Sequence, residues 1–273
     1  MTAAGRIRVG IGGWSYPPWR ETFYPQSVSK NDELVYASRK VSAIEINSTF
    51  YRLPTPAVFA KWRESTPDDF VFSIKAPRYI AQRKTLADAQ PYVDRFISGG
   101  IAELRDRLGP ILWQLTPQQA FEPDDLRRFL EFLPSEIDGL KLRHALEVRH
   151  QSFADPRFLE SARAHHVTVV FEDDKSYPGF ADVTGDFVYA RLRRSESSEP
   201  TGYSLPALQT WTARAKTWAH GDEPTDLPRV QKKIIAKTTP RDVFIYFING
   251  AKERAPAAAM QLIENLASRS DLR

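Results

Sequence analysis

Eight short runs rich in β-branched or aromatic residues recur along this chain, and nearly every run ends in a polar side chain. The runs cover residues 8–14, 43–47, 70–75, 111–115, 145–150, 167–173, 187–192 and 243–249. Several are near-continuous apolar segments rather than alternating ones, which is typical of parallel strands that are buried on both faces. The pattern predicts eight parallel strands whose polar ends meet at a common mouth.

The segments between these runs carry helix signals. Thr55-Pro56 and Asp155-Pro156 each place an N-cap residue before a proline at the first helical position. The other expected features are a helix over 32–40 capped by Asn31, a break at Gly99-Gly100, a helix from Glu122 or Pro123 to Phe132, a loop over 195–203 and a closing helix from 255 onward.

Alternating strands and helices in these numbers predict a single TIM-like (β/α)8 barrel over residues 1–273. The chain length of 273 residues is close to the roughly 250 residues typical of such a barrel. An open, doubly wound sheet is the alternative, because the periodicity of a strand cannot distinguish a closed sheet from an open one. The count of eight strands favours the barrel.

Composition excludes several classes of chemistry. The chain has no cysteine, which excludes disulfides, thiolate metal ligands and cysteine nucleophiles. No run approaches the roughly 20 apolar residues of a membrane span, so a cytoplasmic protein is expected. The net charge is +4, and basic residues cluster at 191–194 and at Arg229, Lys232, Lys233, Lys237 and Arg241. The second cluster is interpreted as a solvated helix face.

Strands two and five each place two polar residues on one face. Glu45 and Asn47 alternate with Ile44 and Ile46, and Glu147 alternates with Val148 before Arg149. In a barrel these polar side chains point into the lumen near its mouth. Two interpretations are open: Glu45 and Glu147 are acid–base groups tuned by Arg149, or the three form an internal ion-pair network that stabilises the barrel.

Lys75 ends strand three, where apolar surroundings can lower the pKa of an amine enough for a base or a Schiff-base former. The alternative is an ammonium that simply holds an anion. Gln114 and Asn249 end strands four and eight, and each amide can orient a ligand or satisfy loop backbone.

The rim of the mouth supplies further candidates for substrate binding. Arg191 and Lys252 follow strands seven and eight, where barrels often hold phosphate groups. Trp14 and Tyr51 can stack on a ligand or pack as a lid. His150 is the one histidine expected at this end, and Asp173 adds a carboxylate after strand six. No recognised metal-ligand spacing is present, so no metal and no cofactor are expected.

The motifs together resemble the uncharacterised YecE-like family, domain of unknown function 72. The resemblance covers almost the whole chain and rests on these segments: 10–14 with Trp19, 45–51, Lys75, 114–117, 147–150 with Ser152 and Phe153, 189–191 and 246–249. It implies a TIM-like barrel with a polar pocket at the strand carboxyl ends, and no established reaction. The family commonly has a His-Gly pair after the strand-seven arginine, whereas Leu192, Arg193 and Arg194 follow it here.

These observations favour an enzyme that uses acid–base chemistry on a small polar or anionic substrate, similar to a sugar or a nucleotide. The predicted catalytic residues are Glu45, Lys75, Glu147 and Arg149. A nucleic-acid binding protein or phosphodiesterase is an alternative, motivated by the basic clusters. A non-catalytic barrel that binds a metabolite or a partner protein is another.

Overall fold

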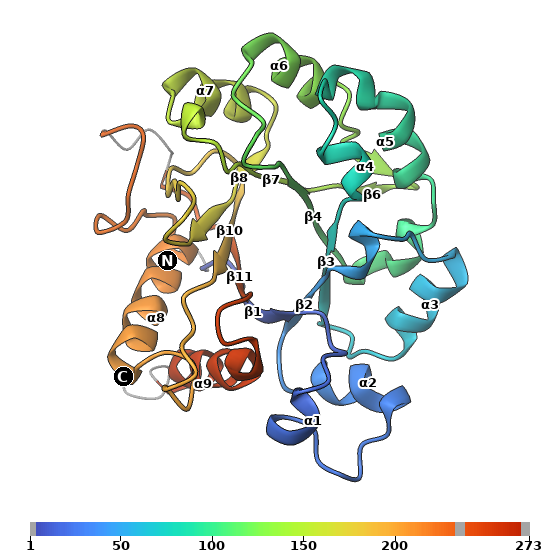
Figure 1. The fold of residues 1–273 in the computed structure, drawn as a ribbon, viewed down its shortest axis with the longest axis vertical. Coiled ribbons are helices and arrows are strands. Elements are labelled where there is room, and N and C mark those ends of the chain that lie inside the picture. The colour runs from blue at the N-terminus through green and yellow to red at the C-terminus, as the bar shows by residue number, and fades with distance from the viewer. Residues whose placement is uncertain (1–3, 233–237, 269–273) are drawn as a thin grey trace.

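Parallel strands form a ring at the centre of the molecule, and helices surround it (Figure 1). The computed structural model describes residues 4–232 and 238–268. The strands of the ring are β1 (Ile7–Gly12), β2 (Ala43–Ile46), β3 (Val71–Lys75), β4 (Leu108–Gln114), β7 (His144–Glu147), β8 (Thr168–Val169), β9 (Phe171–Asp173), β10 (Phe187–Leu192) and β11 (Asp242–Phe247). All eight predicted strand segments are confirmed.

The ring is closed through its sixth strand, which consists of two pieces. β8 and β9 are separated only by Val170, whose amide donates to the carbonyl oxygen of Leu146 at 3.0 Å. β8 pairs with β7 and β9 pairs with β10, so the strand order β8-β7-β4-β3-β2-β1-β11-β10-β9 starts and ends in one segment of chain. The TIM-like barrel is therefore confirmed, and the open-sheet alternative is wrong.

The helices follow the strands around the outside of the ring (Figure 1). They are α1 (Trp19–Thr22), α2 (Glu33–Ala37), α3 (Pro56–Glu64), α4 (Arg78–Ala81), α5 (Gln90–Ile97), α6 (Pro123–Glu131), α7 (Pro156–Ala164), α8 (Leu205–Ala219) and α9 (Ala255–Ala267). A hairpin of β5 (Glu136–Ile137) and β6 (Leu140–Lys141) stands apart from the ring. None of the helices within 4–232 and 238–268 is long and apolar enough to cross a membrane.

Most helix signals in the sequence are confirmed, and two predictions are wrong. Asp155 caps α7 by accepting a hydrogen bond from the amide of Arg157 at 2.8 Å. Asn31 does not cap a helix over 32–40. It lies inside a short 3-10 turn, α2 covers only Glu33–Ala37, and turns follow it before the buried Val41 and β2.

The second basic cluster is not a solvated helix face in its described residues. Arg229 pairs with Glu223, and Arg241 is buried. No helix runs through residues 229–232 or 238–241. Lys233 and Lys237 lie outside the described residues.

The barrel has two separate cores. The larger one fills the space between the strands and the helices and contains Trp19, Trp113 and Trp218. The smaller one lies inside the ring and consists of Ala43, Val71, Leu112, Ala145, Val170, Phe187, Tyr189, Phe244, Tyr246 and Ile248. Burial on both sides explains the near-continuous apolar character of the strands.

Glycine at a lumen position of β1 makes room for the inner core. A Cβ at Gly10 would lie 2.2 Å from the carbonyl oxygen of Ala43 and 2.9 Å from Cε1 of Tyr246. Both atoms belong to neighbouring strands, so a larger residue would force β2 or β11 away from β1. The Tyr246 ring takes up the space, and its hydroxyl lies 2.6 Å from the hydroxyl of Ser73.

We expect one histidine of the outer core to make stability depend on pH. His144 is buried, accepts a hydrogen bond from Trp113 Nε1 on Nδ1 at 3.1 Å, and contacts the carbonyl oxygen of Pro134 through Nε2. Burial lowers the pKa of His144 below its usual value. As pH falls, the unfolded chain therefore takes up a proton that the folded protein resists, and stability is lost.

Urea unfolding of the wild type and a His144→Gln variant measures this effect. Between about pH 7 and about pH 5, the free energy of unfolding of the wild type should fall more steeply than that of the variant. Equal slopes for the two proteins would show that His144 does not contribute.

Candidate functional site

A cavity of about 360 Å³ opens at the carboxyl ends of the strands. On β2 and β7 the lumen-facing residues become more polar toward the cavity. Ala43 is followed by Glu45 on β2, and Ala145 is followed by Glu147 and then Arg149 on β7 and just beyond it. The cavity is lined by Gly12, Asn47, Tyr51, Lys75, Gln114, Arg149, Arg191, Arg193, Phe247, Ile248, Asn249 and Lys252. An apolar floor, a middle layer of carboxylates and a top layer of cations and amides thus follow one another along the lumen.

Arg191 joins two carboxylates in the middle layer. Its Nε and Nη2 each donate to an oxygen of Glu45 at 3.0 Å, and its Nη1 donates to Glu147. The hydroxyl of Tyr189 also donates to Glu45, at 2.8 Å. Arg191, Glu45 and Glu147 are all almost completely buried. The sequence left open an internal ion-pair network around Arg149; a network is present, but the cation that joins Glu45 to Glu147 is Arg191, and Arg149 pairs with Glu147 alone of these two.

The charges of this network hold Glu147 in its ionised form. Burial raises the pKa of the Glu147 carboxyl, but the guanidinium groups of Arg191 and Arg149 outweigh burial and lower the pKa to about 2. Gln114 Nε2 also donates to Glu147, at 2.7 Å. A carboxylate with this many donors and no exposed surface is poorly suited to exchange protons with a ligand at neutral pH.

Glu172 is the third buried carboxylate, and it faces two arginines of the top layer. Its Oε1 accepts hydrogen bonds from Arg149 Nη2 at 3.2 Å and from Arg193 Nη1. Its Oε2 is buried without a hydrogen-bond partner among the described residues. Burial and the nearby Glu147 carboxylate raise the pKa of Glu172 to about 7.

Both of these arginines retain donors that face no acceptor. Within the described part of the chain, neither Arg149 Nη1 nor Arg193 Nη2 makes a hydrogen bond. The ring of Tyr177 lies 4.6 Å from the Arg149 guanidinium carbon and 5.7 Å from that of Arg193. These contacts hold the two guanidinium groups at the edge of the cavity with N–H groups left for a ligand.

Lys75, like Lys252, is a cation of the cavity that has no ion-pair partner among the described residues. Its Nζ lies 3.9 Å from the centre of the Phe50 ring, and it makes no ion pair or hydrogen bond with any residue in 4–232 or 238–268. Burial, followed by the charge of Arg191, lowers the pKa of Lys75 to about 8, although Glu45 and Glu147 act in the opposite direction. Its amine can therefore change protonation state close to neutral pH.

Lys252 completes the cation layer from the loop after β11. Its Nζ lies 4.5 Å from the Tyr16 ring and 5.7 Å from the Trp19 ring. Burial lowers the pKa of Lys252. The preceding residues Asn249 and Gly250 both have positive φ angles, which turn the chain sharply at the mouth.

Eight of the residues predicted for the site line this cavity, and five do not. The predicted lining residues found there are Asn47, Tyr51, Lys75, Gln114, Arg149, Arg191, Asn249 and Lys252. Trp14 instead packs edge-on against Trp62 at 5.0 Å, His150 contacts the Ser152 hydroxyl at 2.8 Å, and Asp173 pairs with Arg194 at 3.0 Å. Glu45 and Glu147 lie below the cavity.

Arg193, Glu172 and Tyr189 belong to the site although they were not among the residues predicted for it. A signal for two of them was available, because Tyr189 and Arg193 alternate with Arg191 and so share its face of the strand. Glu172 lies opposite Arg191 in the pairing of β9 with β10. No group of three or more histidine, aspartate or glutamate side chains in the described residues is arranged to hold a metal ion.

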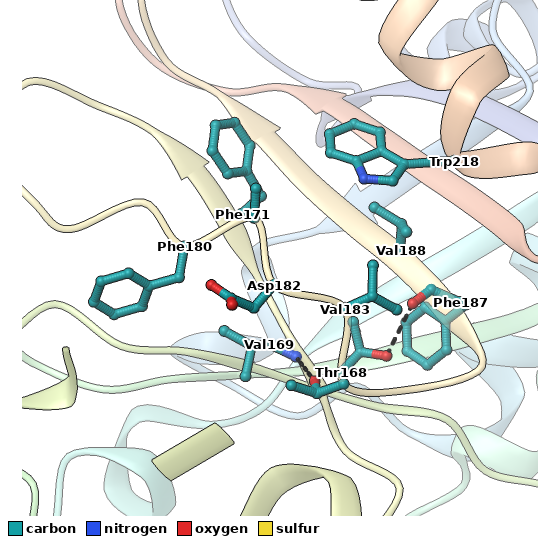
Figure 2. Close-up of a pocket in the computed structure, with 11 residues that line it drawn as sticks. Thr168, Val169, Phe171, Phe180, Asp182, Val183, Phe187, Val188 and Trp218 are labelled. Atoms are coloured by element: carbon teal, nitrogen blue, oxygen red, sulfur yellow. Dashed lines mark hydrogen bonds between the residues drawn. The ribbon is translucent and has the colours of Figure 1, made fainter. Parts of the chain in front are cut away.

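Two other cavities among the described residues differ from this one in size or in position. Figure 2 shows Phe171, Phe180 and Trp218 around a pocket. Its volume is about 10 Å³, which is room for at most one water molecule. Asp182 lines it, and its carboxylate accepts hydrogen bonds from the amides of Val230 and Gln231. A cavity of about 550 Å³ that includes His144 and His165 lies at the opposite end of the barrel, away from the strand carboxyl ends.

Comparisons with known proteins identify relatives along nearly the whole chain. A family model described as "Protein of unknown function DUF72" matches residues 8–272. The UPF0759 protein YecE of Escherichia coli is 33% identical over 150 residues, which are 54% of this chain and 50% of that protein. The chain thus aligns with about half the length of this curated relative.

Solved structures show the same fold. A DUF72 family protein from Thermotoga maritima has a TM-score of 0.73 at 22% identity, covering 96% of this chain and 99% of the other. A DUF72 family protein from Enterococcus faecalis has a TM-score of 0.68 at 16% identity, covering 96% and 98%. At these identities the likeness extends to the barrel and not to a reaction.

Proposed function

This chain belongs to the DUF72 family of proteins of unknown function, and from the chemistry of its cavity we propose that it is an enzyme for a small anionic substrate. Arg149, Arg193 and Lys252 hold the anionic group. Lys75 exchanges a proton with the reacting part of the substrate. Glu45, Glu147 and Arg191 are not reacting groups, and they fix the positions of the residues above them.

The composition of the cavity lining supports this proposal. Five basic side chains line it, and the lining residues in the described part of the chain include no carboxylate. An excess of donors over acceptors favours a ligand with negative charge and several acceptor oxygens. The volume of about 360 Å³ lies at the lower end of the range for small-molecule sites.

Lys75 is suited to proton transfer because of its surroundings. A general acid or base works best when its pKa lies near the operating pH, and the pKa of Lys75 is lowered to about 8. Asn47 and Gln114 supply amide groups on either side of it along the ring. These amides can orient hydroxyl or carbonyl groups of a substrate.

The basic cluster after β10 does not favour a nucleic-acid partner. Arg191 and Arg193 line the cavity, and Arg194, the most exposed arginine of this cluster, is already paired with Asp173 at 3.0 Å. Cations that are already compensated by carboxylates release few counterions from a phosphate backbone. A small ligand in the cavity therefore accounts better for the arrangement.

Turnover tests the proposal directly. We expect small phosphorylated or carboxylated compounds to raise the melting temperature, and at least one of them to be chemically changed after incubation, as measured by mass spectrometry. Compounds that bind and are recovered unchanged would instead indicate a non-catalytic binding barrel. No stabilisation by any anionic compound would contradict the proposed site.

Replacing Lys252 by Met should weaken anion binding without breaking an ion pair. Lys252 Nζ makes no ion pair with a described residue, so the variant removes one positive charge and leaves the carboxylate network intact. A charged hydrogen bond contributes about 1.5–3 kcal/mol, so the Kd for inorganic phosphate should rise roughly ten- to hundredfold. Isothermal titration calorimetry measures this.

The matched control is Lys61→Met on the exposed face of α3. It makes the same change of side chain and net charge away from the cavity. Equal phosphate affinity in the two variants would show that phosphate responds to overall charge and not to this site.

A further inference from the structure

We propose that Lys75 is a covalent nucleophile whose amine forms an imine with a small aldehyde or ketone that also carries a phosphate or carboxylate group. This inference rests on the proposed function, which supplies a cavity that holds the anionic end of the substrate. It adds the substrate class, a carbonyl compound, and the bond that the enzyme makes to it.

The first observation is that the Lys75 amine makes no ion pair with any of the three buried carboxylates of the site. Arg191 takes up both oxygens of Glu45, and Arg191 and Arg149 share Glu147. Arg149 and Arg193 share Glu172. A lysine that served only to balance charge would be paired with one of these carboxylates, whereas arginines occupy all three.

The second observation is that the amine is both sheltered and open to the cavity. Lys75 is 9% exposed, and the flat face of Phe50 covers one side of the ammonium at 3.9 Å. Its remaining surface lines the cavity. Burial and nearby cations lower the pKa of such an amine, so a larger fraction of it is in the neutral, nucleophilic form than for the amine of a surface lysine.

The third observation is the position of the free donors. Arg149, Arg193 and Lys252 line the same cavity of about 360 Å³ as Lys75. A molecule held there by its phosphate or carboxylate group is confined with the amine in a small space. Such confinement replaces an encounter between two molecules by a reaction within one complex.

The proposed step is balanced without any oxidant or reductant. The lone pair of the neutral Lys75 Nζ forms a bond to the carbonyl carbon, and the π electrons of the C=O bond move to the oxygen. The nitrogen then releases one proton and the oxygen takes up one, which gives a neutral carbinolamine. The resulting carbinolamine loses its oxygen as water when a second proton reaches that oxygen. The products are a protonated imine and one molecule of water.

Borohydride trapping tests this step in the full-length protein. The protein is incubated with dihydroxyacetone phosphate, with pyruvate or with uncharged dihydroxyacetone, and borohydride then reduces any imine to a stable amine. Peptide mass spectrometry locates the adduct. We expect an adduct on Lys75 with dihydroxyacetone phosphate or pyruvate, in higher yield than with dihydroxyacetone. Comparison of the two anionic probes identifies the preferred anionic group.

Two variants make the result specific. Lys75→Arg keeps the positive charge and should abolish the adduct, while Lys61→Arg removes an exposed lysine and should leave the yield at Lys75 unchanged. Stabilisation of Lys75→Arg by inorganic phosphate shows that the variant is folded and still binds anions.

The outcomes separate this inference from the proposed function. Absence of an adduct on Lys75 with both anionic probes, or adducts spread over surface lysines at equal yield, overturns the imine. If phosphate still raises the melting temperature in that case, the anion site stands and only the covalent step is lost. If phosphate and pyruvate also fail to stabilise the protein, both proposals fail.

Discussion

Replacing Arg191 by Met is expected to lower the free energy of unfolding by about 3–5 kcal/mol, because two buried carboxylates then lose their shared cation. Glu45 and Glu147 are fully buried, and Arg191 donates to both. For a domain of this size the melting temperature should fall by roughly 10 °C. Urea unfolding and a thermal scan measure the two quantities.

The dependence of this loss on pH identifies its cause. In the wild type the pKa of Glu147 is lowered to about 2 from its usual 4.5, so its contribution to stability is present above pH 4.5 and is lost as pH falls toward 2. Without Arg191, burial should act against the ionised form of Glu147 and raise its pKa. The variant should therefore become more stable, relative to the wild type, as the pH is lowered.

A second substitution supplies the control. Adding Glu45→Gln to Arg191→Met removes one uncompensated charge at nearly constant volume, and the double variant should be more stable than Arg191→Met alone at neutral pH. A loss below about 1 kcal/mol for Arg191→Met, or no recovery in the double variant, would contradict a structural role for this network.

Replacing Lys75 by Met should lower kcat by roughly 10²–10⁴ for any substrate that the wild type converts. The change removes the amine and keeps an unbranched apolar stem against Phe50, so the stability of the protein should change little. Steady-state kinetics on a substrate identified by mass spectrometry measure the effect. Activity within tenfold of the wild type would exclude Lys75 as a reacting group.

The pH profile adds an independent measurement. Lys75 is faced by the cations Arg191 and Arg149 and by the carboxylates of Glu45 and Glu147, and its pKa is lowered to about 8. If the neutral amine reacts, kcat/KM should rise as pH increases through about 8. Lys252→Met should retain this rise and should raise KM more than it lowers kcat, because its expected role is binding.

The sequence was informative about the barrel because its signals are local. Runs of β-branched and aromatic residues at regular intervals, with Pro-initiated helices between them, identified all eight strands. The prediction failed at the ends of one helix, because Asn31 lies inside a 3-10 turn instead of capping a helix, and α2 ends at Ala37 instead of Lys40.

Alternation along the strands also predicted which side chains gather at the mouth. Asn47, Lys75, Gln114 and Arg149 were selected because they continue the lumen-facing alternation at or just past a strand end, and all of them line the cavity. Loop residues gave a mixed result, because Tyr51, Asn249 and Lys252 line the cavity and two others do not. Trp14 and His150 lie beyond the ends of their strands, where no fixed periodicity sets the direction of a side chain.

By itself, then, the sequence determined the strands, the order in which they follow one another and the polar character of one end of the barrel. Only the tertiary structure decided how the charges pair. Glu45 and Arg191 are 146 positions apart, and both could have faced any carboxylate or cation in the lumen. They meet because the ring is closed and because both residues lie at the same height along the barrel axis. As a result the arginines pair with the buried carboxylates, and the amine of Lys75 makes no ion pair with a described residue.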